Sequence, residues 1–346
     1  MEKQRNSSLE CLRILCMFGI IFMHTFGMFY KTATGINLVM GTIINSIFNM
    51  GVSVFMLISG YFGIRFSSKK LVSLECTVLF YSILGMFFKG IILESWSAST
   101  VLKSILPIST KYYWYMSVYI IIFVCSGYIN MFIDSLDKKM FLKFICLMLL
   151  FFSIMPTFAY YEIMGDNGKG LMNMVLMYLI GRYIKICNVK PSCRICRGVC
   201  IATVITCVLN YIFAMWHGGI GLFAPFARDN SLTIILSSIF MFLFFLNITF
   251  YSKTINVIAK GMFATYLCEG TIRLILNSFI PWEKYVSSWY LFVLISLYTI
   301  VVMIICLFIE TIRKSIYTLF EDDIYKRIMN IWDFFIKKCL DWFIRL

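Results

Sequence analysis

Long apolar stretches, separated by short polar segments, follow one another along almost the whole chain. Ten of them hold about twenty residues each, at positions 9–30, 38–64, 72–93, 112–133, 141–161, 170–187, 198–216, 231–251, 257–280 and 289–310. A helix of about 20 apolar residues crosses the ~30 Å hydrocarbon core of a bilayer. The pattern therefore predicts an all-α polytopic membrane protein with about ten transmembrane helices, which form one domain over residues 1–315.

The pattern changes after residue 315. From Glu321 to Leu346, charged residues alternate with large apolar ones such as Trp332 and Phe335. A helix of this kind lies in the membrane interface with its apolar face toward the lipid. We expect residues 316–346 to form a cytoplasmic amphipathic tail that anchors the chain and takes no part in chemistry.

Composition and charge agree with a multi-pass protein of the cell membrane. Of the 346 residues, 61% are hydrophobic and only 14% are charged, which excludes an ordinary water-soluble domain. The net charge of +14 could indicate nucleic-acid binding, but 23 of the 31 basic residues fall on one alternating set of loops. Because basic residues collect on the cytoplasmic side, both termini are predicted to be cytoplasmic, and no nucleic-acid partner is expected.

Two polar residues interrupt the first apolar stretch, Arg13 and His24. Eleven residues at 100° each make about three helical turns, so both side chains project from the same stripe, ~16 Å apart along the axis. An ionisable residue inside a membrane span is costly unless it faces a protein interior or a water-filled path. His24 is therefore a candidate site.

A histidine side chain suits two roles here. It can act as a general base toward a hydroxyl group, or as a proton relay in a transporter of a glycan precursor or metabolite. A transporter would favour internal repeats with broken helices, which the sequence does not show. The other histidine, His217, falls at the outer end of the seventh stretch and is the fallback base.

The motif formed by Arg13, ten intervening residues and His24 is followed by Ser59-Gly60-Tyr61-Phe62. This combination resembles the membrane-bound acyltransferase 3 family, whose members O-acylate cell-surface carbohydrates. The resemblance extends over most of the chain, through Tyr113-Trp114-Tyr115, residues 178–184 and Asn230-Ser231. It is closest to members that modify surface polysaccharides without an attached extracytoplasmic domain.

The resemblance implies an O-acyltransferase that moves an acyl group, expected to be acetyl, from cytoplasmic acyl-CoA. The acceptor would be a hydroxyl of an envelope polysaccharide or of a lipid-linked sugar. Acyl-CoA is then a co-substrate, and no resident cofactor or metal is expected. His24 would deprotonate the acceptor or briefly carry the acyl group itself, while Arg13 is a candidate to bind the phosphates of coenzyme A.

Other residues of the resemblance are candidates to contact substrate, among them Ser59, Gly60, Tyr61 and Phe62. Ser59 could also act as a nucleophile, although a close-packed span end at Ser59 and Gly60 explains it better. Arg65 could bind phosphate or mark the cytoplasmic side. Trp114 could offer its ring face to a sugar or belong to an interfacial aromatic belt.

One position departs from the family. After Thr265-Tyr266-Leu267, relatives commonly have a histidine two residues on, whereas this chain has Cys268 and Glu269. Glu269 and Arg273 are four residues apart and could pair on one helical face. The pair could lock helices together, or Glu269 could orient His24 or the acceptor. The departure also leaves open a catalytically inactive scaffold.

Overall fold

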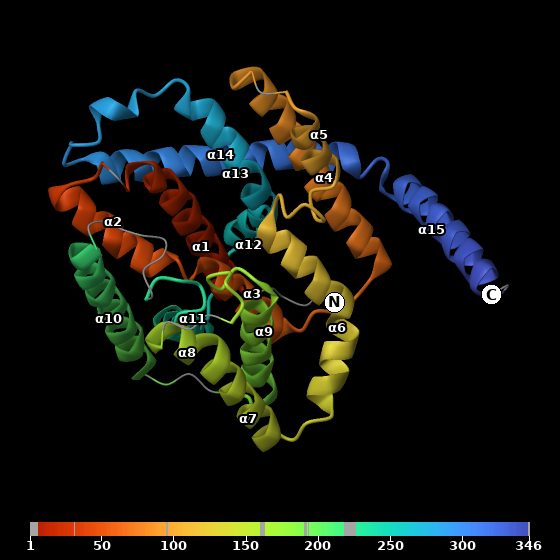
Figure 1. Cartoon of the computed structure of the whole chain (residues 1–346), viewed down its shortest axis with the longest axis horizontal. Helices are drawn as coiled ribbons and strands as arrows, with labels where there is room; N and C mark the ends of the chain where they lie inside the picture. The colour runs from red at the N-terminus through yellow and green to blue at the C-terminus, as the bar shows by residue number, and fades with distance from the viewer. Residues whose placement is uncertain are drawn as a thin grey trace.

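The computed structural model describes residues 6–344 apart from 31, 95, 160–162, 190–191, 193 and 218–225, and all regular structure in these residues is helical (Figure 1). The helices are α1 (Ser7–Phe26), α2 (Gly35–Phe48), α3 (Gly51–Phe62), α4 (Ser68–Ile92), α5 (Ala98–Ile105), α6 (Trp114–Asp134), α7 (Lys138–Leu149), α8 (Met155–Phe158), α9 (Leu171–Ile186), α10 (Arg194–His217), α11 (Leu232–Asn247), α12 (Lys253–Ala259), α13 (Met262–Asn277), α14 (Leu291–Tyr317) and α15 (Glu321–Ile344). The predicted all-α class is confirmed.

Seven helical segments in the described residues are long and apolar enough to cross a membrane. They are Ser7–Phe29, Gly35–Phe62, Ser68–Ile92, Trp114–Asp134, Lys138–Phe158, Arg194–Phe213 and Leu291–Tyr317. The three other predicted stretches form shorter helices: α9 and α11 have 16 residues each, and α12 is separated from α13 at Lys260-Gly261. Ten spans, cytoplasmic termini and a domain boundary at residue 315 stay predictions.

Helix α1 lies at the centre of the bundle, in contact with α2, α3, α11, α12, α13 and α14 (Figure 1). Its first turn is capped by the Asn6 side chain, which accepts hydrogen bonds from the backbone N–H groups of Ser8 and Leu9. The Ser7 hydroxyl donates to Asn256 at 3.0 Å and so ties this end to α12. Because α1 is continuous from Ser7 to Phe26, it holds Arg13 and His24 on one rigid element.

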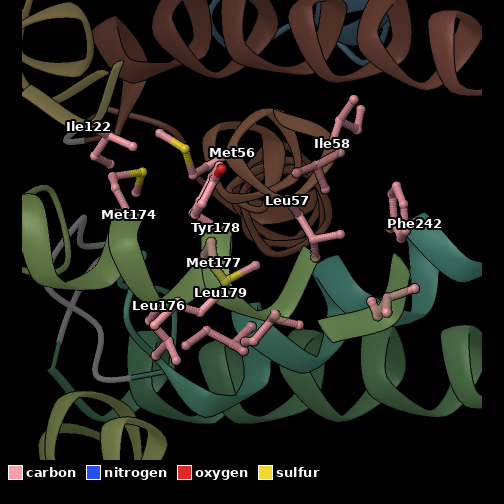
Figure 2. Close-up of a cluster of buried hydrophobic side chains, with 14 of the residues drawn as sticks. Met56, Leu57, Ile58, Ile122, Met174, Leu176, Met177, Tyr178, Leu179 and Phe242 are labelled. Atoms are coloured by element: carbon pink, nitrogen blue, oxygen red, sulfur yellow. The ribbon is translucent and has the colours of Figure 1, made fainter. Parts of the chain in front are cut away.

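The closest helix crossing joins α3 and α9. Figure 2 shows Leu57 of α3 pointing toward α9, with Met177, Tyr178 and Leu179 on the facing helix. A Cβ atom on Gly60 would overlap the carbonyl oxygen of Tyr178, and one on Gly181 would overlap that of Leu57. The two glycines therefore let the backbones touch, as small residues do in membrane helix pairs.

Replacing Gly60 with alanine should lower the stability of the folded protein by about 1–3 kcal/mol, because backbone cannot move aside for the new methyl group. We would measure monodisperse yield and melting temperature in detergent. Gly127 of α6 is the matched control, since a Cβ there meets nothing within 4 Å. If the Gly60→Ala and Gly127→Ala proteins melted at the same temperature, that result would contradict the close packing of α3 on α9.

The turn after α3 is fixed by polar contacts. Gly63 has a φ of 75°, in the region that favours glycine. The Tyr178 hydroxyl accepts from the Ile64 N–H at 3.2 Å and donates to Asn130 at 2.8 Å, while the Asn130 amide donates to the Ile64 carbonyl at 2.9 Å. The segment that carries Arg65 is thus held against α6 and α9.

Residues after α14 form helix α15, which extends away from the bundle (Figure 1). Its first turns dock on the beginning of α4: Lys69 pairs with Asp322 at 2.9 Å, and Tyr325 is hydrogen-bonded to Ser68 at 3.1 Å. The tail predicted after residue 315 is therefore helical over Glu321–Ile344, and its place at a membrane surface stays a prediction.

Candidate active site

His24, Glu269 and Arg273 form a hydrogen-bonded cluster between α1 and α13. The Nδ1 atom of His24 lies 2.9 Å from Oε1 of Glu269. The second carboxylate oxygen accepts from Nε of Arg273, one helical turn further along α13. Arg273 also donates through Nη1 to the His24 backbone carbonyl, at 3.1 Å. The cluster holds the histidine by its ring and by its backbone.

The cluster determines which histidine nitrogen can react. A carboxylate only accepts hydrogen bonds, so Nδ1 of His24 carries the proton that points at Glu269. The neutral ring then has its lone pair on Nε2. The His24 side chain is 46% exposed, whereas that of Glu269 is 7% exposed. Nε2 is thus available to a substrate while Glu269 orients the ring from behind.

Contacts from α14 and α6 fix α13 in turn. The Tyr298 hydroxyl is 3.2 Å from the Arg273 carbonyl and donates to Asn277 at 2.7 Å. On the other side, the Tyr113 hydroxyl donates to the Leu267 carbonyl at 3.0 Å. Three helices therefore determine the position of the carboxylate relative to α1.

Two cavities open at His24. The first, of about 520 Å³, lies between α4, α6 and α13, and its wall includes Lys89, Tyr112 and Tyr113. The second, of about 320 Å³, lies toward α2 and the loops that precede α9 and α11. Both are lined by the same five residues: His24, Trp114, Tyr266, Glu269 and Arg273. We call them the aromatic cavity and the loop cavity.

A third cavity lies at the Arg13 end of α1 and has a volume of about 510 Å³. Its wall combines the cations Arg13, Lys260 and Lys314 with the aromatic residues Tyr115 and Tyr119. Tyr266 lines this cavity and both cavities at His24. Ile20 and Val52 also line both the Arg13 cavity and the loop cavity, so the Arg13 cavity adjoins the cavities at His24.

The structure brings together some predicted site residues and separates others. Arg13 and Ser59 line the Arg13 cavity, Trp114 and Glu269 border His24, and the Ser59 hydroxyl donates to the Phe55 carbonyl at 2.9 Å. None of the three cavities has Gly60, Tyr61, Phe62 or Arg65 in its wall.

These four residues lie elsewhere in the fold. Gly60 touches α9, and Tyr61 packs against Phe242 and below the Lys185 ammonium group. Phe62 is 56% exposed, and Arg65 is exposed as well. The side chain of His217 lies outside the described residues. In the part of the chain that is described, no three His, Cys, Asp or Glu side chains are grouped to hold a metal ion.

Sequence reasoning missed Tyr266 and the polar wall of the loop cavity. In the sequence, Tyr266 belongs to the stretch that precedes the departure from the family, and no pattern indicates that it lines a cavity. Lys169 and Asp229 follow no helical pattern, because each lies in a loop. Only the folded chain places them beside Asn45 of α2 and Asn49, the residue that follows this helix.

Fold and site together define a class: a helical membrane protein in which a buried carboxylate is hydrogen-bonded to a partly exposed histidine. The chain belongs to the acyltransferase 3 family, because a family model described as an acyltransferase domain matches residues 6–310. That match includes every residue named here in the three cavities except Lys314. No curated protein and no solved structure matches the chain. The resemblance carried by Arg13, His24 and residues 59–62 is confirmed, and the protein is a membrane acyltransferase.

Proposed function

We propose that the protein transfers an acetyl group from cytoplasmic acetyl-CoA to a hydroxyl of an envelope glycan, either a polysaccharide or a lipid-linked saccharide. The observation that carries the proposal is the His24–Glu269 hydrogen bond of 2.9 Å, with the ring exposed to two cavities at one end of α1 and the Arg13 cavity at the other end. Such a site suits a donor that arrives from one side of a cell membrane and an acceptor presented on the other.

The Arg13 cavity suits the donor. Arg13, Lys260 and Lys314 offer positive charge to the phosphates of coenzyme A, and arginine can bind phosphate through two parallel hydrogen bonds. The wall also includes the apolar and aromatic residues Ile20, Val52 and Tyr115. Ile20, Val52 and Tyr266 line the loop cavity as well, which brings this wall next to the cavities at His24. The pantetheine arm would extend along this wall toward His24, with the Arg13 end on the cytoplasmic side.

The aromatic cavity suits the acceptor sugar, whose ring face can pack on Trp114. Nε2 of His24 takes the proton of the acceptor hydroxyl, and at the same time the hydroxyl oxygen forms a bond to the carbonyl carbon of the thioester. The tetrahedral intermediate then collapses, the carbon–sulfur bond breaks, and the imidazolium returns the proton to the coenzyme A thiolate. Glu269 keeps Nδ1 protonated throughout and stabilises the imidazolium.

The test is ester-linked acetate on purified envelope glycan from a strain with the gene, a deletion strain and a complemented deletion. We expect acetate that hydroxylamine releases in the first and third strains only. Purified protein should also move label from [¹⁴C]acetyl-CoA to glycan taken from the deletion strain. Equal acetate in all three strains, with no labelled glycan in vitro, would overturn the proposal and favour the transporter interpretation.

Replacing Arg13 with glutamine should raise the KM for acetyl-CoA about tenfold and change kcat little. A charge-assisted hydrogen bond to phosphate contributes about 1.5–3 kcal/mol, and it stabilises bound donor and transition state equally. Initial rates at varied acetyl-CoA would measure the effect. Lys143→Gln, an exposed cation on α7, is the matched control. A fall in kcat at unchanged KM would place Arg13 at the reacting group instead.

A further inference from the structure

The loop cavity is the polar counterpart of the aromatic cavity. It adjoins His24 through the five residues that both cavities share, so a ligand can contact the histidine from either cavity. Beyond those residues its wall carries Tyr30, Asn45, Asn49, Lys169 and Asp229. A volume of about 320 Å³ falls within the range of small-molecule sites.

Two polar groups of this wall are buried, and hydrogen bonds hold several of its side chains in place. Asn45 and Asp229 are each 4% exposed. The Tyr30 hydroxyl donates to the Asn45 side chain at 3.4 Å, and the Asn49 amide donates to the Ala227 carbonyl. Burying such groups is costly unless they are hydrogen-bonded. Amide, carboxylate, ammonium and phenol groups together offer the donors and acceptors that neighbouring sugar hydroxyls require.

Two loops are locked together to bring Lys169 and Asp229 to this wall. The Asp229 N–H donates to the Asn167 carbonyl at 3.1 Å, and the Asn173 amide donates to the Gly168 carbonyl at 2.9 Å. Gly168 has a φ of 80°, and a Cβ there would overlap Asn230. The loops thus fit against each other only with glycine at this position, which fixes the wall before any ligand arrives.

The electrostatics of the wall favour a neutral polar ligand. Burial raises the pKa of Asp229 to about 7, although Lys169 and the Asn49 hydrogen bond act to lower it. Near neutral pH the carboxyl group therefore both donates and accepts hydrogen bonds. A sugar ring with hydroxyl groups satisfies both roles, whereas an acyl chain or a lipid tail would leave the polar groups of the wall without hydrogen-bond partners.

We propose that the loop cavity binds a second sugar of the acceptor, next to the sugar that is acylated in the aromatic cavity. This inference rests on the proposed function. The acceptor is then an oligosaccharide or polysaccharide segment of at least two sugar units, which lies across His24. The neighbouring sugar unit is held by Asn45, Asn49, Lys169 and Asp229. Its position selects which hydroxyl of the acylated sugar reaches Nε2.

The experiment uses envelope glycan from the deletion strain, cut by partial acid hydrolysis and separated into monosaccharides, disaccharides and longer fragments. Purified full-length protein in nanodiscs receives these fragments with [¹⁴C]acetyl-CoA, and kcat/KM is measured for each size. We expect disaccharides and longer fragments to be at least tenfold better acceptors than monosaccharides. The Lys169→Met and Asp229→Asn variants should each reduce this disaccharide-to-monosaccharide ratio severalfold.

Lys103→Met, which removes an exposed lysine of α5 outside the three cavities, is the control and should keep the wild-type ratio. Lys169 is itself exposed, so its variant tests the site even if Asp229→Asn folds poorly. Equal kcat/KM for all sizes, or a ratio unchanged in both variants, would overturn the second sugar site while leaving the acyltransferase intact. No labelled ester on any fragment would instead overturn the proposed function.

Discussion

Replacing His24 with alanine is expected to reduce acyl transfer by at least about 10²- to 10⁴-fold, the range in which a positioned general base contributes. The side chain is 46% exposed, and the hydrogen bond that it makes among the described residues is to Glu269. Glu269 keeps its Arg273 partner when the ring is removed. The amount of folded protein should therefore stay at the wild-type level while kcat collapses.

The measurement is single-turnover transfer of [¹⁴C]acetyl from acetyl-CoA to glycan, normalised to folded protein. His24→Gln is the matched variant, because its amide can still donate to Glu269 but has no basic nitrogen, and it should be as inactive as His24→Ala. Added imidazole should restore part of the rate only in the alanine variant, where the ring leaves space. Activity above a tenth of wild type at normal abundance would rule out His24 as the base.

The second large effect is expected from Glu269→Gln, which should lower kcat at least ~10²-fold with little change in the KM for acetyl-CoA. A glutamine amide can donate to Nδ1 of His24 and so favour the tautomer whose Nε2 is protonated and cannot act as a base. The carboxylate also stabilises the imidazolium that forms during transfer. Both contributions arise at the reacting centre, so donor binding is unaffected.

Glu310 provides the control that separates orientation from helix locking. It is 5% exposed and pairs with Arg313 three residues along α14, much as Glu269 pairs with Arg273. If both pairs serve only to lock helices, the two glutamine variants should lose folded protein alike and keep wild-type kcat per folded molecule. We expect instead that Glu310→Gln lowers the melting temperature and keeps kcat, and that Glu269→Asp recovers part of the activity. Glu310 also pairs with Lys314 of the Arg13 cavity at 3.2 Å, so the comparison rests on kcat and not on the KM for acetyl-CoA.

Hydropathy was sufficient to predict the helical class and the position of most helices. Apolar runs of the right length predicted α1, α4, α6 and α14 closely, because each is one unbroken helix in the structure. The predicted stretch 170–187 matches α9 to one residue at each end. Hydropathy did not predict the break between α12 and α13, nor the end of α11 at Asn247. Helix ends depend on local hydrogen bonds and on tertiary contacts, and a hydropathy window averages over both.

The candidate site was predictable only where one helix carries it. The spacing of Arg13 and His24 is a property of α1 alone, so the shared stripe follows from the sequence. Glu269 and Arg273 could be paired for the same reason, although the contact of Glu269 with His24 was one of two alternatives. Asp229 had no such signal, because its neighbours come from distant parts of the chain.

The hydrogen bond between His24 and Glu269 joins residues 245 positions apart in the sequence. During synthesis, α1 enters the membrane long before α13 has been translated. A nascent chain that already carries the histidine therefore lacks the carboxylate to which it is hydrogen-bonded. On the proposed function, a chain that ends before α13 is expected to be inactive, because the candidate site is complete only once α13 has packed against α1.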